Sequence, residues 1–84
     1  MVKRGDVVQI LAGHDAGRYC VVLGWADGYP LLADGKLRTL QKPKRKNPKH
    51  LQAAGTALEE RMLTSDRQIR KALHPFNYGQ TAKL

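Results

Sequence analysis

The most constraining feature of this sequence is a series of short apolar runs separated by turns that contain glycine. Residues 5–13 and 18–25 read GDVVQILAG and RYCVVLGW, and both have the β-branched and aliphatic residues that favour strands. The run YPLLA at 29–33 follows an Ala-Asp-Gly turn, and Pro30 restricts it to the start or the edge of a strand. Short strands joined by tight turns predict a small barrel, because closure removes exposed strand edges.

The turns between these runs carry their own signals. The segment 13–17 has a glycine at each end and an aspartate inside, which predicts a tight loop between two strands. An Asp-Gly pair at 34–35 is a strong hairpin signal and predicts a fourth strand over 36–40. A fifth short strand is predicted over 50–54. We expect four turn residues to have structural roles: Gly13, Gly17, Asp34 and Gly35.

After residue 55, helix signals replace strand signals. The sequence SDRQ at 65–68 has the capping-box form, a hydroxyl residue followed three residues later by Glu or Gln. Apolar residues at 69, 72 and 73 fall on one helical face, and Pro75 ends the pattern. These features predict a helix over 66–73. A similar TALE sequence predicts a shorter helix over 57–63.

The expected fold class is therefore mainly β, a small barrel of four or five strands with one or two short C-terminal helices. A chain of 84 residues corresponds to one domain. We expect the barrel to cover residues 1–55, including a basic segment at 41–50. A helical extension is expected over 56–75 and a flexible tail over 76–84.

Positive charge is concentrated in that basic segment, QKPKRKNPKH at 41–50, which we call the basic arm. The whole chain has a net charge of +8, and residues 36–50 hold seven Lys or Arg residues and no acid. Two prolines favour an extended path for the arm, on which basic side chains can follow a phosphate backbone. Such contacts give affinity but little sequence discrimination.

The predicted nucleic-acid contacts are the basic residues of the arm together with three that flank turns. None of the five aromatic residues alternates with the arm, which favours structured RNA over unpaired bases. Packing and base stacking both remain open as roles for Tyr19, Trp25 and Tyr29. The predicted contacts are Arg18, Lys36, Arg38, Lys42, Lys44, Arg45, Lys46, Lys49 and His50.

Other functional classes lack support in the sequence. Cys20 is the only cysteine, and with His14 and His50 it lacks zinc-site spacing, so no disulfide and no metal are expected. Turn chemistry explains the aspartates near glycines, and no catalytic or cofactor motif is present, so we expect neither an enzyme nor a cofactor. No apolar run approaches the roughly 20 residues of a spanning helix. We therefore expect a cytoplasmic monomer without membrane contacts.

The order of residues in 5–25, GDVVQILAGHDAGRYCVVLGW, resembles the KOW motif of ribosomal proteins and of NusG-type transcription elongation factors. The resemblance rests on Gly5-Asp6 opening a strand, on the Ala12-Gly13 turn, and on Gly17 before a basic residue and a valine-rich strand. The segments 31–51 and 63–73 extend it. Together they are similar to KOW-containing large-subunit ribosomal proteins of archaeal and eukaryotic type, and more so to small stand-alone bacterial KOW-domain RNA-binding proteins.

This resemblance implies an SH3-like barrel, with Gly17 as the central glycine of the motif, and a function in RNA binding. Together with the charge pattern, it predicts a non-catalytic protein that binds structured ribosomal RNA, is associated with the ribosome in translation and contacts ribosomal proteins. One alternative is a protein-interaction module of the transcription or translation machinery, in which Trp25, Tyr29 and the C-terminal helix form an apolar patch. DNA binding is a second alternative.

Overall fold

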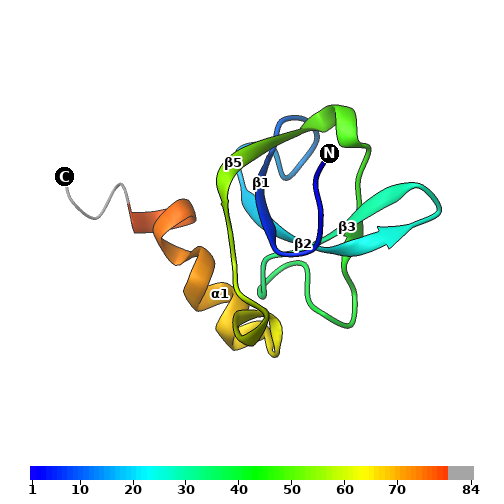
Figure 1. Ribbon diagram of the computed structural model, residues 1–84. Coiled ribbons are helices and arrows are strands. Elements are labelled where there is room, and N and C mark those ends of the chain that lie inside the picture. Colours follow the sequence, from blue (N-terminus) through cyan, green and yellow to red (C-terminus); the bar gives the residue numbers. More distant parts are fainter. Residues whose placement is uncertain (80–84) are drawn as a thin grey trace.

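A curled antiparallel sheet forms the body of the protein in the computed structural model, which describes residues 1–79 (Figure 1). The strand order β4-β3-β2-β1-β5 is a meander in which the last strand returns to the first. A single 3₁₀ turn precedes that last strand. The five strands are β1 (Asp6–Ile10), β2 (Tyr19–Ala26), β3 (Tyr29–Ala33), β4 (Lys44–Arg45) and β5 (Leu51–Ala57), and the 3₁₀ turn is Pro48–His50. The expected fold class is confirmed.

The hairpin between β2 and β3 turns on Asp27 and Gly28. Ala26 pairs with Tyr29, so only two residues connect the strands. The φ angles of Asp27 and Gly28 are 52° and 82°. Two consecutive positive φ angles define a type I′ turn, whose twist matches that of the flanking strands. The Ala-Asp-Gly turn of the sequence is therefore a tight hairpin.

In the middle of the sheet, along β1 and the first half of β2, both faces are buried. Neighbouring residues in a strand point to opposite faces, so Val7 lies on one face and Val8 on the other. One face packs against the C-terminal segment, and the curled sheet encloses the other face. The buried residues of the first cluster are Val7, Val21, Ala33, Leu63, Ile69 and Leu73. Those of the second are Val8, Ile10, Cys20, Val22 and Leu32.

The predicted C-terminal helix is present as α1 (Asp66–His74). The Ser65 hydroxyl accepts a hydrogen bond from the Gln68 amide at 3.2 Å, which caps the first turn, and Pro75 follows the last helical residue. Ile69 and Leu73 are fully buried against the sheet, and each contributes about 2 kcal/mol of burial free energy. The expected helix over 57–63 is reduced to a 3₁₀ turn, Glu60–Leu63, because β5 continues to Ala57.

The predicted fourth strand over 36–40 is wrong. The Asp34 and Gly35 amides both donate to the Arg38 carbonyl oxygen, at 2.8 and 3.0 Å, and close a loop. The Leu40 amide then donates to the Asp66 carboxylate at 2.8 Å. These residues therefore contact the loop and the start of α1. The strand beside β3 is β4, which lies inside the basic arm, and the expected fifth strand is β5.

Past α1, a π-helical turn (Pro75–Gly79) packs on the start of β2. The Asn77 amide oxygen accepts from the Tyr19 amide at 2.9 Å, and its amide nitrogen donates to the Tyr19 carbonyl at 3.2 Å. The Phe76 and Tyr19 rings lie 5.4 Å apart. The segment that we expected to be flexible, 76–84, thus begins in a turn with defined contacts. Its remaining residues, 80–84, lie outside the described residues.

Each helix within residues 1–79 is too short or too polar to cross a bilayer.

The thiol of Cys20 is an ionisable group inside the core. Its side chain belongs to the enclosed cluster and is 1% exposed. Burial raises the pKa of the Cys20 thiol to about 12, because the interior disfavours a thiolate. Cys20 is thus a small apolar core residue.

We predict that iodoacetamide at pH 8 leaves Cys20 of the folded protein unmodified and alkylates it in guanidinium chloride. The folded-state pKa lies above the ordinary value of about 8.5, so the protonated thiol stabilises the fold fully below that pH. This contribution is lost as the pH rises toward about 12. Mass spectrometry of the labelled protein measures the reaction. Native labelling at the rate of a free thiol would contradict this account of the core.

A second stability prediction compares Gly35→Ala with Gly17→Ala. Both glycines have positive φ angles, 82° and 93°, so each alanine should cost about 1 kcal/mol of backbone strain. At Gly35 a Cβ atom would also overlap the Asp66 carbonyl oxygen and lie 2.8 Å from the Arg70 amide nitrogen. Nothing lies within 4 Å at Gly17. Urea unfolding should therefore show an additional loss of about 2 kcal/mol for Gly35→Ala. Equal losses of unfolding free energy in the two variants would mean that the backbone of α1 does not pack against Gly35.

Candidate nucleic-acid interface

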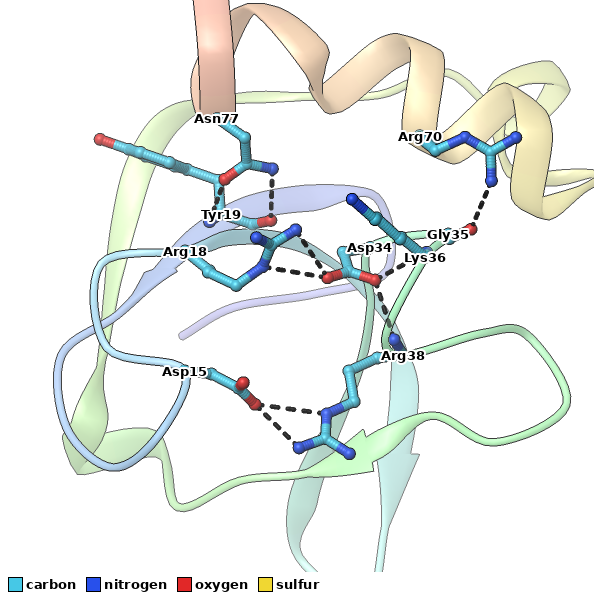
Figure 2. A network of polar contacts seen from close by, with 9 residues as sticks. All are labelled: Asp15, Arg18, Tyr19, Asp34, Gly35, Lys36, Arg38, Arg70 and Asn77. Atoms are coloured by element: carbon cyan, nitrogen blue, oxygen red, sulfur yellow. Dashed lines mark hydrogen bonds and ion pairs between the residues drawn. The ribbon is translucent and has the colours of Figure 1, made fainter.

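A buried carboxylate, that of Asp34 at the end of β3, organises the loops next to the basic arm (Figure 2). Asp34 is only 3% exposed. Its Oδ1 atom accepts from the Lys36 and Arg38 amides, each at 2.9 Å. Its Oδ2 atom accepts a hydrogen bond from Arg18 Nε at 3.2 Å and forms an ion pair with Arg18 Nη2 at 3.1 Å. Three hydrogen bonds and this ion pair engage both oxygens, which makes the burial of the carboxylate tolerable.

Two of the predicted nucleic-acid contacts are used inside this network. Arg18 pairs with Asp34, and the Arg38 guanidinium donates to Asp15 Oδ2 at 3.0 and 3.2 Å (Figure 2). Arg38 thereby ties the 34–38 loop to the 13–17 loop. Because both arginines already have carboxylate partners, their structural role accounts for their positions. Nothing in the geometry requires them to contact phosphate.

Arg45 in β4 also has partners. Its guanidinium lies 3.0 Å from Asp27 and 5.9 Å from the centroid of the Tyr29 ring. The pair is exposed, so it adds little stability. Since side chains alternate along a strand, Lys44 and Lys46 project to the other side from Arg45. The Lys46 ammonium lies beside Gly13, at the loop between β1 and β2.

The four lysines of the basic arm have a different environment. None of the ion pairs found within residues 1–79 includes Lys42, Lys44, Lys46 or Lys49. All seven acids of the chain are engaged elsewhere: six in those ion pairs, and Asp66 with the Leu40 amide. The arm therefore carries uncompensated positive charge. His50 adds an exposed ring at its end, and the His50 carbonyl accepts from the Leu11 amide at 2.8 Å.

A second group of basic residues lies on α1, and our sequence reasoning missed it. These residues occupy positions 67, 70, 71 and 74, the i, i+3, i+4, i+7 spacing of one helical face. We used this periodicity only for the apolar residues that pack on the sheet. Lys36, a predicted contact, lies with this group and not with the arm. We call the group the helix basin: Lys36, Arg67, Arg70, Lys71 and His74, which line one open cavity of about 780 Å³.

The three aromatic residues divide between two roles. Tyr19 packs against Phe76 beside the core. Trp25 and Tyr29 are 38% and 40% exposed, so neither is a core residue. The Trp25 indole donates to the Val2 carbonyl at 3.1 Å and borders a groove of about 380 Å³. Packing thus explains Tyr19, and a contact role remains open for the other two.

In the part of the chain that the structure describes, no group of three or more His, Cys, Asp or Glu side chains is placed to hold a metal ion. Comparison of the sequence with protein-family models and with curated proteins finds no match.

We predict that Asp34→Ala destabilises the fold by about 3 kcal/mol, since it leaves Arg18 and two loop amides without their acceptor. Asp27→Ala is the matched control. Asp27 also stands in an Asp-Gly pair and also binds an arginine, but its side chain is 83% exposed. Its loss should cost less than about 1 kcal/mol. Thermal unfolding of both variants measures the difference, and similar melting temperatures would remove Asp34 from the centre of the fold.

Proposed function

We propose that this protein is a non-catalytic RNA-binding protein whose basic arm binds the phosphate backbone of structured RNA. The barrel holds the arm in place, because β4 pairs with β3 and the Lys46 amide donates to the Pro30 carbonyl at 3.2 Å. The middle of the arm is thus an edge strand of the sheet with a defined path. Side chains on such an edge present their charges with little loss of backbone freedom on binding.

One observation carries the proposal: the four arm lysines lack carboxylate partners, although three arginines in and around the same loops are paired with acids. Within residues 1–79, Arg18, Arg38 and Arg45 each have an aspartate, and the four arm lysines do not. Concentrated like charges repel one another, and a polyanion relieves that repulsion. Release of the counterions of the polyanion supplies much of the binding free energy.

The choice of RNA rests on the resemblance to KOW-domain proteins, and ribosomal RNA is the first candidate on the same ground. Binding to structured RNA is favoured because no aromatic residue alternates with the arm lysines. The Arg45 guanidinium lies over one face of the exposed Tyr29 ring, which leaves that face less available for stacking on a base. Phosphate and 2′-hydroxyl contacts to a folded RNA do not need stacking.

The alternative, a protein-interaction module, has one observation in its favour, the exposed Trp25 at the small groove. The apolar face of the C-terminal helix, which this alternative also needs, is not exposed, because Ile69 and Leu73 of α1 are fully buried against the sheet.

The nucleic-acid content of the protein purified from cells distinguishes RNA binding from protein binding. RNA binding predicts a high 260/280 absorbance ratio that ribonuclease lowers and deoxyribonuclease does not. A ratio that deoxyribonuclease lowers and ribonuclease does not would indicate DNA. A 260/280 ratio typical of pure protein at low salt would favour a protein partner.

We predict that Lys42→Ala, Lys46→Ala and Lys49→Ala together weaken binding to a ribosomal RNA fragment and to an unrelated structured RNA alike. Each lysine acts as a point charge on phosphate, so the slope of log K against log salt should flatten by about 2 to 3. Fluorescence anisotropy across a salt series measures both quantities. The changes lie outside β4, so the melting temperature should stay within about 2 °C of the wild type.

The matched control is Lys3→Ala with Arg61→Ala, which lowers the net charge at side chains that already lie beside carboxylates. This control should retain the wild-type slope. Equal slopes for the wild type and the arm variant would exclude the arm from the binding site. A variant that lost preference between the two RNAs would indicate base recognition instead of backbone contact.

A further inference from the structure

The helix basin lies apart from the basic arm. In Figure 1, α1 lies at the lower left and the green segment 41–50, which contributes the edge strand β4, lies on the opposite side of the view. The loop of residues 34–40 connects β3 to that segment. The cations of the helix basin come from two elements, since Lys36 belongs to the 34–38 loop and the others belong to α1. Folding therefore brings together charges that lie about 30 residues apart in the sequence.

The charge of the basin is not compensated by acids. Within residues 1–79, no ion pair includes Lys36, Arg67, Arg70 or Lys71. Arg70 donates one hydrogen bond, from Nη1 to the Gly35 carbonyl at 2.9 Å (Figure 2). That acceptor is neutral, so it orients the guanidinium without cancelling its charge. An oriented guanidinium with remaining N–H donors is a strong phosphate ligand.

The second wall of the cavity is aromatic. The rings of His74 and Tyr78 lie 5.1 Å apart, tilted by 44°. The pKa of the Tyr78 hydroxyl lies below its ordinary value, first through a hydrogen bond with Arg18 and then through the charge of Lys36. The local field thus favours a negatively charged oxygen at this position. An anionic group entering the cavity meets the same field.

The length of the basin indicates what kind of anion it fits. From Arg67 to His74, seven residues of helix rise about 10 Å at 1.5 Å per residue. Successive phosphates of one strand are about 3.4 Å apart along the axis of B-form DNA, and their axial spacing in an RNA duplex is of the same order. The row of side chains is therefore about as long as three successive phosphates, which is longer than a single small anion. A nucleic-acid strand lying along α1 would meet Arg67, Arg70 and Lys71 in turn.

We propose that the helix basin is a second RNA-backbone site, so that the protein contacts two stretches of phosphate on different sides of its sheet. The proposal rests on the RNA-binding function proposed above and extends it to α1. The apolar face of the helix holds it on the sheet, and its basic face is directed to the ligand. The helix then has a binding role in addition to its structural one.

The test is the variant Arg67→Ala with Lys71→Ala, titrated with duplex RNA over a salt series. Both side chains are exposed, and alanine is the best helix former, so α1 should remain intact. Circular dichroism and thermal melting verify this point. Loss of two phosphate contacts should flatten the slope of log K against log salt by about 1.5. The charge-preserving exchange Arg67→Lys with Lys71→Arg should keep most of the slope.

The outcomes separate this proposal from the one on which it rests. If the wild type binds and the arm variant flattens the slope while the basin variant does not, the basin is overturned and the arm remains. If the Lys3→Ala, Arg61→Ala control flattens the slope as much as the basin variant, the effect is one of net charge and the basin is again overturned. If the wild type does not bind RNA, both proposals are overturned.

Discussion

The hydrogen-bonded burial of the Asp34 carboxylate is the interaction on which the rest of the arrangement depends. Its three hydrogen bonds and its ion pair fix the turn after β3 and bind the start of β2 through Arg18. Fixing that turn places Gly35 against the backbone of α1, where a larger residue would not fit. The same turn sends the chain outward toward β4 and the basic arm. One carboxylate therefore sets the position of both cationic surfaces without lying in either.

The distribution of acids explains how a small basic domain keeps a defined fold and still presents charge. Its aspartates next to the loops hold arginines, which suit such pairs because a planar guanidinium can donate two hydrogen bonds to one carboxylate. Its arm lysines have no such partners within the described residues. In the loops and the arm, arginines thus pair with aspartates and lysines are the proposed backbone contacts. The helix basin adds Arg67 and Arg70, which belong to no ion pair within the described residues.

The two Asp-Gly pairs show how much the sequence could predict. At 27–28 the local turn signal is sufficient, and a type I′ hairpin forms. At 34–35 the same dipeptide forms no hairpin, because the carboxylate accepts from the half-buried Arg18 side chain and from two loop amides. Local propensity cannot reveal partners that come from distant segments. The fold class and α1 followed from periodicity, whereas the basin needed its helical spacing to be read for charge as well as for apolar residues.

The central claim is that uncompensated cations of this barrel bind RNA through its backbone, and amide NMR during titration with a structured RNA fragment tests it most directly. The account predicts salt-sensitive shift changes concentrated at residues 42–49, with a second group at 67–74. The edge strand β5, which carries no Lys or Arg, should change little. Changes confined to Trp25 and its groove, or changes that persist at high salt, would contradict the account.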